Sequence, residues 1–342
     1  MDIPDLRGPT TDPTELLQLA EGMHAIEVLA AAVGWLDLFE WLADHPADTK
    51  TVAAAFGLPN RPTHVMLTLL RSLKLVDRDD CGVYSLTQLA REYLLRESPW
   101  SVAPVFAALK DRPACTDMLH VLRTGRPMTF GAADDWASGM GDEMFAEFFL
   151  AAIDSRNAYL AHAVARELDL TRSRRLLDVG GGSGIYSCAL VRRNPELTAT
   201  VFEKHPVAAV ATRAIARREL SDRVSVLAGD MLAEPLPAGY DVHLYSNVLH
   251  DWEEVQAQRL LCSSFRALNP GGRVVVHDAL LDDSGAEPVA VAQYSVLLMA
   301  VTAGRCYAVS EVRDLLSEAG FAEITHTATV VHRDLVTAVK LA

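Results

Sequence analysis

The chain has 342 residues, of which 50% are hydrophobic and 22% charged, a composition that is ordinary for a soluble globular protein with room for two domains. Its formal net charge of −14 argues against a general nucleic-acid-binding protein, because affinity for phosphate requires a basic surface. We expect no membrane span and no signal peptide, since the chain lacks an apolar run of about 18 residues and its start lacks a basic region followed by an apolar one. The five cysteines form no C-x-x-C pair, so we predict reduced thiols in a cytoplasmic protein.

The N-terminal part of the chain predicts a helical domain. Residues 14–42 carry apolar residues at helical spacing, with small residues between them. This pattern predicts one or two helices that are buried on several sides, which is typical of packing against a partner chain. We therefore expect a homodimer.

Residues 51–95 predict the order of a winged helix-turn-helix: a helix, a turn at Gly57–Pro62, a second helix, a turn at Asp79–Gly82 and a short strand. Such a unit can bind DNA, or it can serve as a scaffold for dimerisation. The candidate recognition helix, 61–76, is mostly apolar on an acidic chain, and this favours the scaffold. We predict an all-helical winged-helix dimerisation domain over residues 1–100.

Residues 101–170 predict a helical linker that also contributes to a pocket. The first part contains several Pro, Gly and Asp residues, which indicates irregular helices and loops, and Asp142–Leu168 predicts a helix. Phe145, Phe149 and Ile153 share one face of that helix. They either line a pocket or belong to the core; core is the default interpretation, and Phe149 is the pocket candidate.

From Arg174 onward strands and helices alternate, which predicts an α/β domain over residues 171–342. Helical segments separate the first five strands, so we expect a parallel, doubly wound sheet. Only the sequence HRD separates the last two strands, so we expect them to form an antiparallel hairpin. The predicted strands are 174–180, 198–204, 223–229, 241–247, 271–278, 324–331 and 335–341.

A glycine-rich turn follows the first of these strands, in the sequence LLDVGGGSGIYSCAL. Its glycines, Gly180, Gly182 and Gly184, have the spacing G-x-G-x-G and not the G-x-G-x-x-G of a dinucleotide-binding turn. The lysine of a triphosphate-binding loop is absent. Asp178 precedes the glycines, and an acidic side chain there suits a positively charged ligand better than a polyphosphate.

Two further carboxylates end the next two strands. Glu203 lies at the tip of the second strand, where an acid can accept both hydroxyls of a ribose. Asp230 ends the third strand, where it can accept from an exocyclic amino group such as that of adenine. Together these features predict a nucleoside site without a phosphate site, and S-adenosylmethionine is the ligand that fits.

The motifs LLDVGGGSG, VFEKHP, VLAGDML, DVHLYSNVLHDW and LNPGGRVVVHD resemble those of class I S-adenosylmethionine-dependent O-methyltransferases of the plant caffeate and bacterial antibiotic-biosynthesis type. The resemblance covers essentially the whole chain. It implies a Rossmann-like seven-stranded sheet with an antiparallel final strand and an N-terminal winged-helix dimerisation domain. The cofactor-binding candidates are Asp178, Gly180, Gly182, Glu203, Asp230, Met231 and Ser246.

Methyl transfer to a phenol requires alignment of the acceptor and removal of a proton whose pKa is about 10. His250 follows the fourth strand and is the candidate base, since histidine has an ordinary pKa of about 6.5, and the family's catalytic histidine falls on this position. Asp278 matches the first of two acids that flank that histidine in the plant enzymes. The second falls near Cys306, where this chain has no acid, and the family's usual lysine beside the adenine falls at Ser246.

The helix after the fifth strand is a candidate acceptor wall. Tyr294, Leu298 and Thr302 share a face of this helix, with Met299 beside them, although all four are equally ordinary core residues. The helix contains no histidine, and the adjacent His277 and Asp278 would point to opposite faces of a strand, so we expect no catalytic metal.

The leading hypothesis is therefore methyl transfer to a hydroxyl of a small aromatic secondary metabolite, with His250 as general base. Methylation of an electron-rich ring carbon would need the same base and is the main alternative. A relative that binds the cofactor without transferring its methyl group is a third possibility. A winged-helix regulator that senses S-adenosylmethionine is disfavoured by the apolar recognition helix and by the NVLHDW motif.

Overall fold

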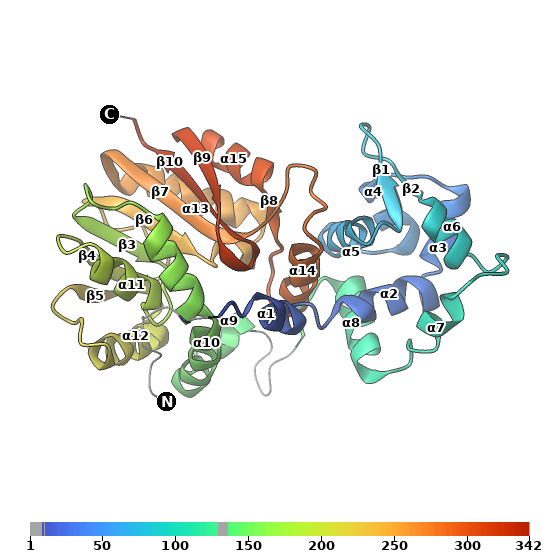
Figure 1. Cartoon of the computed structure of the whole chain (residues 1–342), viewed down its shortest axis with the longest axis horizontal. Coiled ribbons are helices and arrows are strands. Elements are labelled where there is room, and N and C mark those ends of the chain that lie inside the picture. Colours follow the sequence, from blue (N-terminus) through green and yellow to red (C-terminus); the bar gives the residue numbers. More distant parts are fainter. Residues whose placement is uncertain (1–8, 10, 129–135, 342) are drawn as a thin grey trace. The chain divides into compact units, whose positions relative to one another are not determined.

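The computed structural model describes residues 9, 11–128 and 136–341 (Figure 1). The chain forms two compact units, each assembled from separate stretches of sequence. The sheet unit comprises Met1–Leu17, Phe130–Leu280 and Tyr307–Ala342. The helical unit comprises Gln18–Thr129 and Leu281–Cys306, so a segment near the C-terminus belongs to the N-terminal domain.

The helical unit is a helix-turn-helix with a two-stranded wing. Its wing pairs β1 with β2 in antiparallel fashion, so the domain is mostly helical and the expectation of an all-helical domain was wrong in this detail. The elements of this unit, together with α1, which enters it, are α1 (Thr14–Glu21), α2 (Ala25–Gly34), α3 (Leu38–Asp44), α4 (Thr49–Phe56), α5 (Asn60–Ser72), β1 (Val76–Arg78), β2 (Tyr84–Leu86), α6 (Gln88–Tyr93), α7 (Ala103–Ala107), α8 (Pro113–Thr124) and α14 (Val289–Val301).

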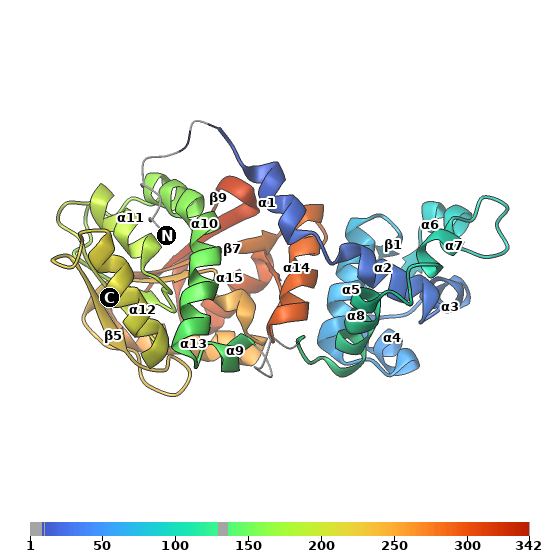
Figure 2. The same cartoon turned by 90° about the horizontal axis from the view of Figure 1, so that it is seen from below.

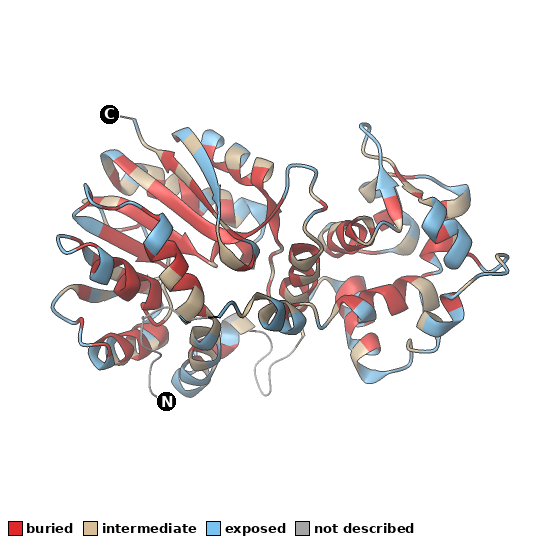
Figure 3. Ribbon diagram, viewed as in Figure 1, coloured by how far each residue is buried: buried red, intermediate tan, exposed pale blue. Residues whose placement is uncertain are grey.

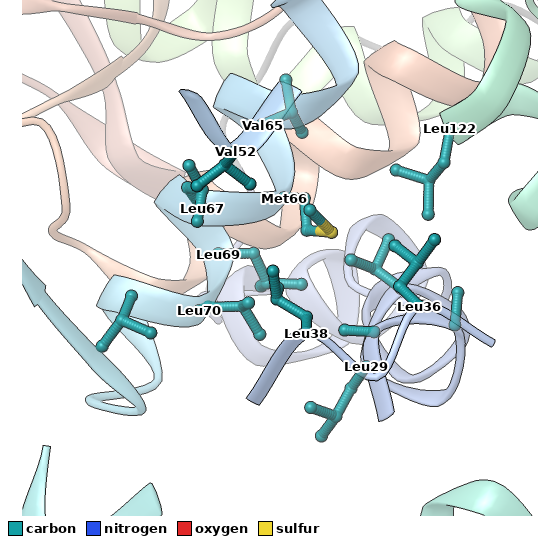
Figure 4. Packing of buried hydrophobic residues seen from close by; sticks show 14 of the residues in the cluster. Leu29, Leu36, Leu38, Val52, Val65, Met66, Leu67, Leu69, Leu70 and Leu122 are labelled. Carbon is teal, nitrogen blue, oxygen red and sulfur yellow. The ribbon is translucent and has the colours of Figure 1, made fainter. Parts of the chain in front are cut away.

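Helix α5 occupies the place of a recognition helix, but it is the core of its unit. Its side chains Val65, Met66, Leu67, Leu69 and Leu70 are fully buried among α2, α3, α8 and α14 (Figure 4). From position 61 to position 72 no residue of α5 is exposed. A helix that reads DNA must present polar side chains to base edges, so this burial supports the scaffold interpretation.

Residues 14–34 form a stretch that is long and apolar enough, by length and composition alone, to cross a membrane. The chain breaks this stretch at 22–24, between α1 and α2. Val28, Ala30, Ala31 and Ala32 of α2 have no exposed surface within the helical unit. Helix α2 therefore has the character of a core helix, whereas α1 exposes Leu16 and Leu19.

The sheet unit is built on eight strands, of which seven run in the order β5-β4-β3-β6-β7-β10-β9, and β8 pairs with β7. Strands β3 to β7 are parallel, and β10 is antiparallel to both of its neighbours, β7 and β9. The strands are β3 (Arg175–Val179), β4 (Thr198–Glu203), β5 (Val224–Ala228), β6 (Tyr240–Ser246), β7 (Leu268–Leu281), β8 (Tyr307–Ala308), β9 (Ala322–Ala328) and β10 (Arg333–Val339).

Helices cover both faces of this sheet because the side chains of each strand alternate between two cores. Leu176 packs on the face of α10, α11 and α12, which Figure 2 shows close together, whereas Leu177 packs on the face of α13 and α15. Figure 3 shows the central strands as largely buried. The remaining elements are α9 (Trp136–Gly139), α10 (Glu143–Glu167), α11 (Ile185–Arg193), α12 (His205–Arg217), η1 (Leu249–Asp251), α13 (Glu254–Ala267), α15 (Val309–Glu318) and η2 (Val330–His332).

The predicted α/β class, the parallel sheet and the terminal antiparallel hairpin are confirmed. The sheet has eight strands and not seven, because the two-residue strand β8 joins β7 at its side. The expected divisions after residues 100 and 170 differ from the limits of the two units. Helix α10 belongs to the sheet unit, and α14 belongs to the helical unit.

Candidate active site

The glycine-rich turn joins β3 to α11 at the carboxyl end of the parallel strands, the edge at which such sheets bind ligands. Gly180, Gly182 and Gly184 have φ values of +67°, +56° and +74°, a region that favours glycine. Gly181 is required for a different reason, since a Cβ there would lie 2.5 Å from Cγ of Asp178. Gly181 was not among the predicted cofactor residues, although the run of three glycines from Gly180 to Gly182 was a visible signal.

Asp178 is fully buried beneath this turn. Its Oδ2 accepts a hydrogen bond of 2.7 Å from the Ser187 hydroxyl, and its Oδ1 has no hydrogen-bond partner among the described residues. Burial raises the pKa of this carboxyl group to about 6, partly offset by the bond from Ser187. A buried carboxylate oxygen without a partner is costly, and a cationic ligand group at the turn would relieve it.

Glu203, at the end of β4, lies against the same turn. Oε1 accepts from the backbone N–H of Gly182 at 3.0 Å, and Oε2 accepts from the N–H of Lys204 at 3.0 Å. Burial raises the pKa of Glu203 to about 7, and the two backbone bonds lower it in part. The carboxylate is thus held at the tip of β4, where the sequence analysis expected a ribose acceptor.

Asp230 follows β5 and is only partly buried. Oδ1 accepts from the backbone N–H of Leu232 at 2.9 Å, and Oδ2 lies 3.6 Å from the Lys204 ammonium group. Met231 lies beside the turn, since its sulfur is 3.5 Å from the position that a Cβ on Gly180 would take. Of the six predicted cofactor positions from β3, β4 and β5, five therefore lie in the turn or against it, namely Asp178, Gly180, Gly182, Glu203 and Met231, and Asp230 follows the neighbouring strand β5.

These features fit S-adenosylmethionine on observations from this chain. A Cβ on Gly180 would meet Val248 at 3.2 Å, and one on Gly182 would meet Leu150 at 3.2 Å, so the turn packs closely against these side chains and leaves little room for any residue but glycine. The orphaned oxygen of Asp178 suits the ammonium group, and the carboxylate of Glu203 suits the ribose. None of the described residues places a lysine or arginine in the turn to hold a polyphosphate.

His250 lies in the short helix η1 after β6 and is 3% exposed. Its ring Nδ1 pairs with Oδ1 of Asp278 on the adjacent strand β7, and its backbone N–H donates to Oδ2 of the same carboxylate at 3.3 Å. Asp278 also accepts from the N–H of Ala279 at 3.2 Å. The predicted pair is therefore in direct contact, and the carboxylate selects the tautomer with its proton on Nδ1, which leaves Nε2 as the basic nitrogen.

Asp251 is the second carboxylate beside this ring. Its Oδ1 lies 3.7 Å from Nε2 of His250. Burial raises the pKa of Asp251 to about 6; His250 and Arg156 lower it and Asp278 raises it. The position expected to hold a second acid, Cys306, is buried in the helical unit, where its N–H donates to the Ser295 hydroxyl at 3.1 Å.

The Ser246 side chain is buried and hydrogen-bonded within the sheet unit. Its hydroxyl is hydrogen-bonded at 2.7 Å to Nδ1 of His277, on the face of the sheet opposite to Asp278, as expected from strand alternation. Burial lowers the pKa of His277 to about 3, so this imidazole is neutral. The role of Ser246 toward the cofactor stays a prediction.

The turn that carries His250 is held by Asn247, Tyr186 and Arg333, none of which was predicted as a site residue. Asn247 has a φ of +54°, and its N–H donates to the carbonyl of His277 at 2.8 Å. Its side-chain amide donates to the Tyr186 hydroxyl at 2.9 Å and accepts from Nε of Arg333 at 3.3 Å. Asparagine tolerates the left-handed region, so its place before the V-L-H-D sequence was a signal that pattern reading did not use.

The predicted acceptor residues lie in both units. Phe149 on α10 stacks on Phe145 at 5.9 Å between ring centroids, within the sheet unit. Tyr294, Leu298, Met299 and Thr302 are buried within the helical unit. Met299 belongs to that unit's core cluster, and the Thr302 hydroxyl donates to the carbonyl of Leu298 at 3.0 Å. Packing within the helical unit is therefore enough to explain why these side chains are buried.

Comparisons with known proteins agree with this geometry. Residues 17–97 match an O-methyltransferase dimerisation domain, and residues 116–322 match an O-methyltransferase domain. The chain is 33% identical over 314 residues to the 3-hydroxy-5-methyl-1-naphthoate 3-O-methyltransferase of Streptomyces sahachiroi, which covers 91% of this chain and 90% of that protein.

Two solved structures are similar over nearly the full length. An O-methyltransferase family 2 protein from Planctomyces limnophilus in complex with apigenin has a TM-score of 0.89 at 31% identity and full coverage of both chains. Human N-acetylserotonin methyltransferase in complex with S-adenosylmethionine has a TM-score of 0.62 at 26% identity, with 98% of this chain and 100% of that chain covered. The chain belongs to the O-methyltransferase family, and it is an S-adenosylmethionine-dependent enzyme.

Proposed function

We propose that this enzyme transfers a methyl group to a hydroxyl of a small aromatic secondary metabolite, and that His250 removes the hydroxyl proton. The observation that carries the proposal is the His250–Asp278 pair, in the same unit as the glycine turn and at the same edge of the sheet. The naphthoate O-methyltransferase of Streptomyces sahachiroi and the Planctomyces protein in complex with apigenin support an aromatic acceptor.

Bound S-adenosylmethionine supplies an activated methyl group, so this chain has to align the acceptor and accept its proton. The backbone of Gly180 and Gly182, with Asp178, Glu203, Asp230 and Met231, would hold the cofactor. Asp178 would face its ammonium group, Glu203 its ribose and Asp230 its adenine amino group.

His250 would take the proton at Nε2 while Nδ1–H stays bonded to Asp278. Asp278 would then have two effects. It fixes the imidazole tautomer, and its negative charge stabilises the imidazolium ion that forms. Because the pair is nearly inaccessible to water, this charge stabilisation is screened less than it would be at the surface.

The candidate acceptor contacts are Phe149 in the sheet unit and, taken separately, Tyr294, Leu298 and Met299 of α14 with the following Thr302 in the helical unit. Aromatic and methionine side chains adapt to flat rings, which suits this assignment. We further propose that the enzyme is cytoplasmic and that its active species is a homodimer; the match to a dimerisation domain supports the homodimer.

The test is incubation with methyl-labelled S-adenosylmethionine and a panel of phenols that includes apigenin, followed by NMR of the products. We expect a new methoxy group on the acceptor. Label on a ring carbon would favour the carbon-methylation alternative, and cofactor binding without transfer to any acceptor would favour a non-methylating relative. The Glu203→Gln variant is the control, since it should lose cofactor affinity while keeping the His250–Asp278 pair.

A further inference from the structure

A buried ion pair between α10 and the end of α12 holds the glycine turn, and the methyl-transfer chemistry does not use this pair. Nη2 of Arg218, the residue after α12, lies 2.8 Å from Oδ2 of Asp154 on α10. The side chains are 2% and 15% exposed, respectively. Burying an ion pair costs desolvation free energy, so stability alone is a weak explanation for this pair.

Both members of this pair also hold Ser183, inside the turn. Nη1 of Arg218 donates to the Ser183 carbonyl at 2.6 Å, and Nη2 donates to the Ser183 hydroxyl at 3.1 Å. The Ser183 hydroxyl in turn donates to Oδ1 of Asp154 at 2.8 Å. These three residues, Asp154, Ser183 and Arg218, form what we call the turn clamp.

A turn with four glycines in five residues loses much conformational entropy when it is fixed, so it needs tethers to keep its N–H groups aimed at a ligand. One tether is the bond from the Gly182 N–H to Oε1 of Glu203 at 3.0 Å. Glu203 is also the proposed acceptor for the ribose hydroxyls. Glu203 would thus serve both the turn and the ribose, whereas the bonds of the turn clamp share no atom with the proposed cofactor contacts.

We propose that Arg218 and Asp154 are positioning residues that preorganise the glycine turn for S-adenosylmethionine and its product S-adenosylhomocysteine. The proposal rests on the cofactor site described above. Preorganisation gains affinity by removing the cost of ordering the turn on binding. The clamp should therefore act on cofactor affinity and not only on the stability of the fold.

The chain contains a matched control for this proposal. Arg213, on α12, also reaches α10, where it pairs with Glu143 at 2.7 Å and Glu147 at 3.3 Å. This second bridge joins the same two helices at the surface, with Arg213 41% exposed, and among the described residues Arg213 makes no hydrogen bond to the turn. Comparison of Arg218→Lys with Arg213→Lys thus distinguishes the effect of holding the turn from the effect of joining α10 to α12.

The experiment measures S-adenosylhomocysteine affinity by calorimetry, well below the unfolding temperature of each variant. Arg218→Lys cannot span the Ser183 carbonyl and the Asp154 carboxylate together, and it should weaken binding by about tenfold or more. Arg213→Lys should stay within about twofold of the wild type. Amide hydrogen exchange at residues 181–184 of the bound protein should be faster in Arg218→Lys alone, a change that a purely structural role would not cause.

Ser183→Ala removes the two hydroxyl bonds and keeps the buried ion pair, so it decides the matter if Arg218→Lys does not fold. We expect it to weaken binding by about threefold or more. Unchanged affinity in Ser183→Ala, or equal losses in Arg218→Lys and Arg213→Lys, would overturn the proposal. If Glu203→Gln also binds with wild-type affinity, the cofactor site itself is wrongly placed; if Glu203→Gln loses affinity and the clamp variants do not, only the clamp fails.

Discussion

Cofactor affinity should depend on pH through Glu203. The carboxylate must be ionised to accept two ribose hydroxyls, but burial raises its pKa to about 7 in the free protein. Binding of S-adenosylhomocysteine therefore expels a proton below this pH. With this pKa the ionised fraction is about nine tenths at pH 8 and about one tenth at pH 6, so affinity should fall about tenfold, or about 1.4 kcal/mol, between them.

A second carboxyl group, that of Asp178, titrates between pH 6 and pH 8 and determines how much pH dependence should remain in a variant without Glu203. Asp178, whose pKa burial raises to about 6, is about half ionised at pH 6, so it adds about a factor of two if it holds the ammonium group. Glu203→Gln should bind at least about tenfold more weakly at pH 8 and retain only that twofold dependence. Glu196→Gln, at an exposed position before the same strand, should behave as the wild type.

Calorimetry at pH 6, 7 and 8, in buffers of different ionisation enthalpy, measures both the affinity and the protons released. About half a proton should leave at pH 7 in the wild type and fewer in Glu203→Gln. Affinity that is flat between pH 6 and pH 8 would refute the reasoning. So would a Glu203→Gln variant that keeps the tenfold dependence.

Three further predictions concern the base, its turn and the assembly. Asp278→Asn should lower kcat by less than loss of His250 does, with S-adenosylhomocysteine affinity unchanged; steady-state kinetics and calorimetry check this, and a silent substitution would remove Asp278 from the mechanism. Asn247→Gly keeps the left-handed conformation and Asn247→Ala does not, so the Ala variant should have the lower melting temperature and kcat, and the reverse order would contradict the role of its φ of +54°. Light scattering should show a homodimer of about twice 37.2 kDa, and replacement of the exposed Leu19 and Met23 by Glu should weaken it; a stable wild-type monomer would contradict the expectation.

The sequence predicted the strands well because buried parallel strands are apolar runs with clear turn signals. Strands β3, β4 and β5 begin and end within about two residues of expectation, and the carboxylates at their tips follow from that placement. Two elements were harder to predict. Strand β8 has two residues and the first wing strand, β1, has three, too few for any periodicity, whereas the second wing strand, β2, was expected after the turn at Asp79–Gly82.

Contacts between residues distant in sequence could not be predicted from local pattern. The turn clamp joins residues 29 and 35 positions apart along the chain, and the His250–Asp278 pair was expected only through the family resemblance. The sequence also could not show that α14 belongs to the helical unit, because an apolar helix of this kind can pack in the core of either unit. Burial of α5, in contrast, follows directly from the apolar composition of the recognition helix.

The central claim is that His250 removes the acceptor proton. The direct measurement is the ratio of wild-type to His250→Ala turnover for a series of phenols of decreasing pKa, at one pH and with saturating S-adenosylmethionine. We predict a ratio of about 10²–10⁴ for ordinary phenols that shrinks toward unity for phenols already ionised at that pH, because a phenolate needs no base. A ratio that is equally large for ionised and neutral phenols would mean that His250 only positions the ring, and a ratio near unity throughout would contradict general-base catalysis by this residue.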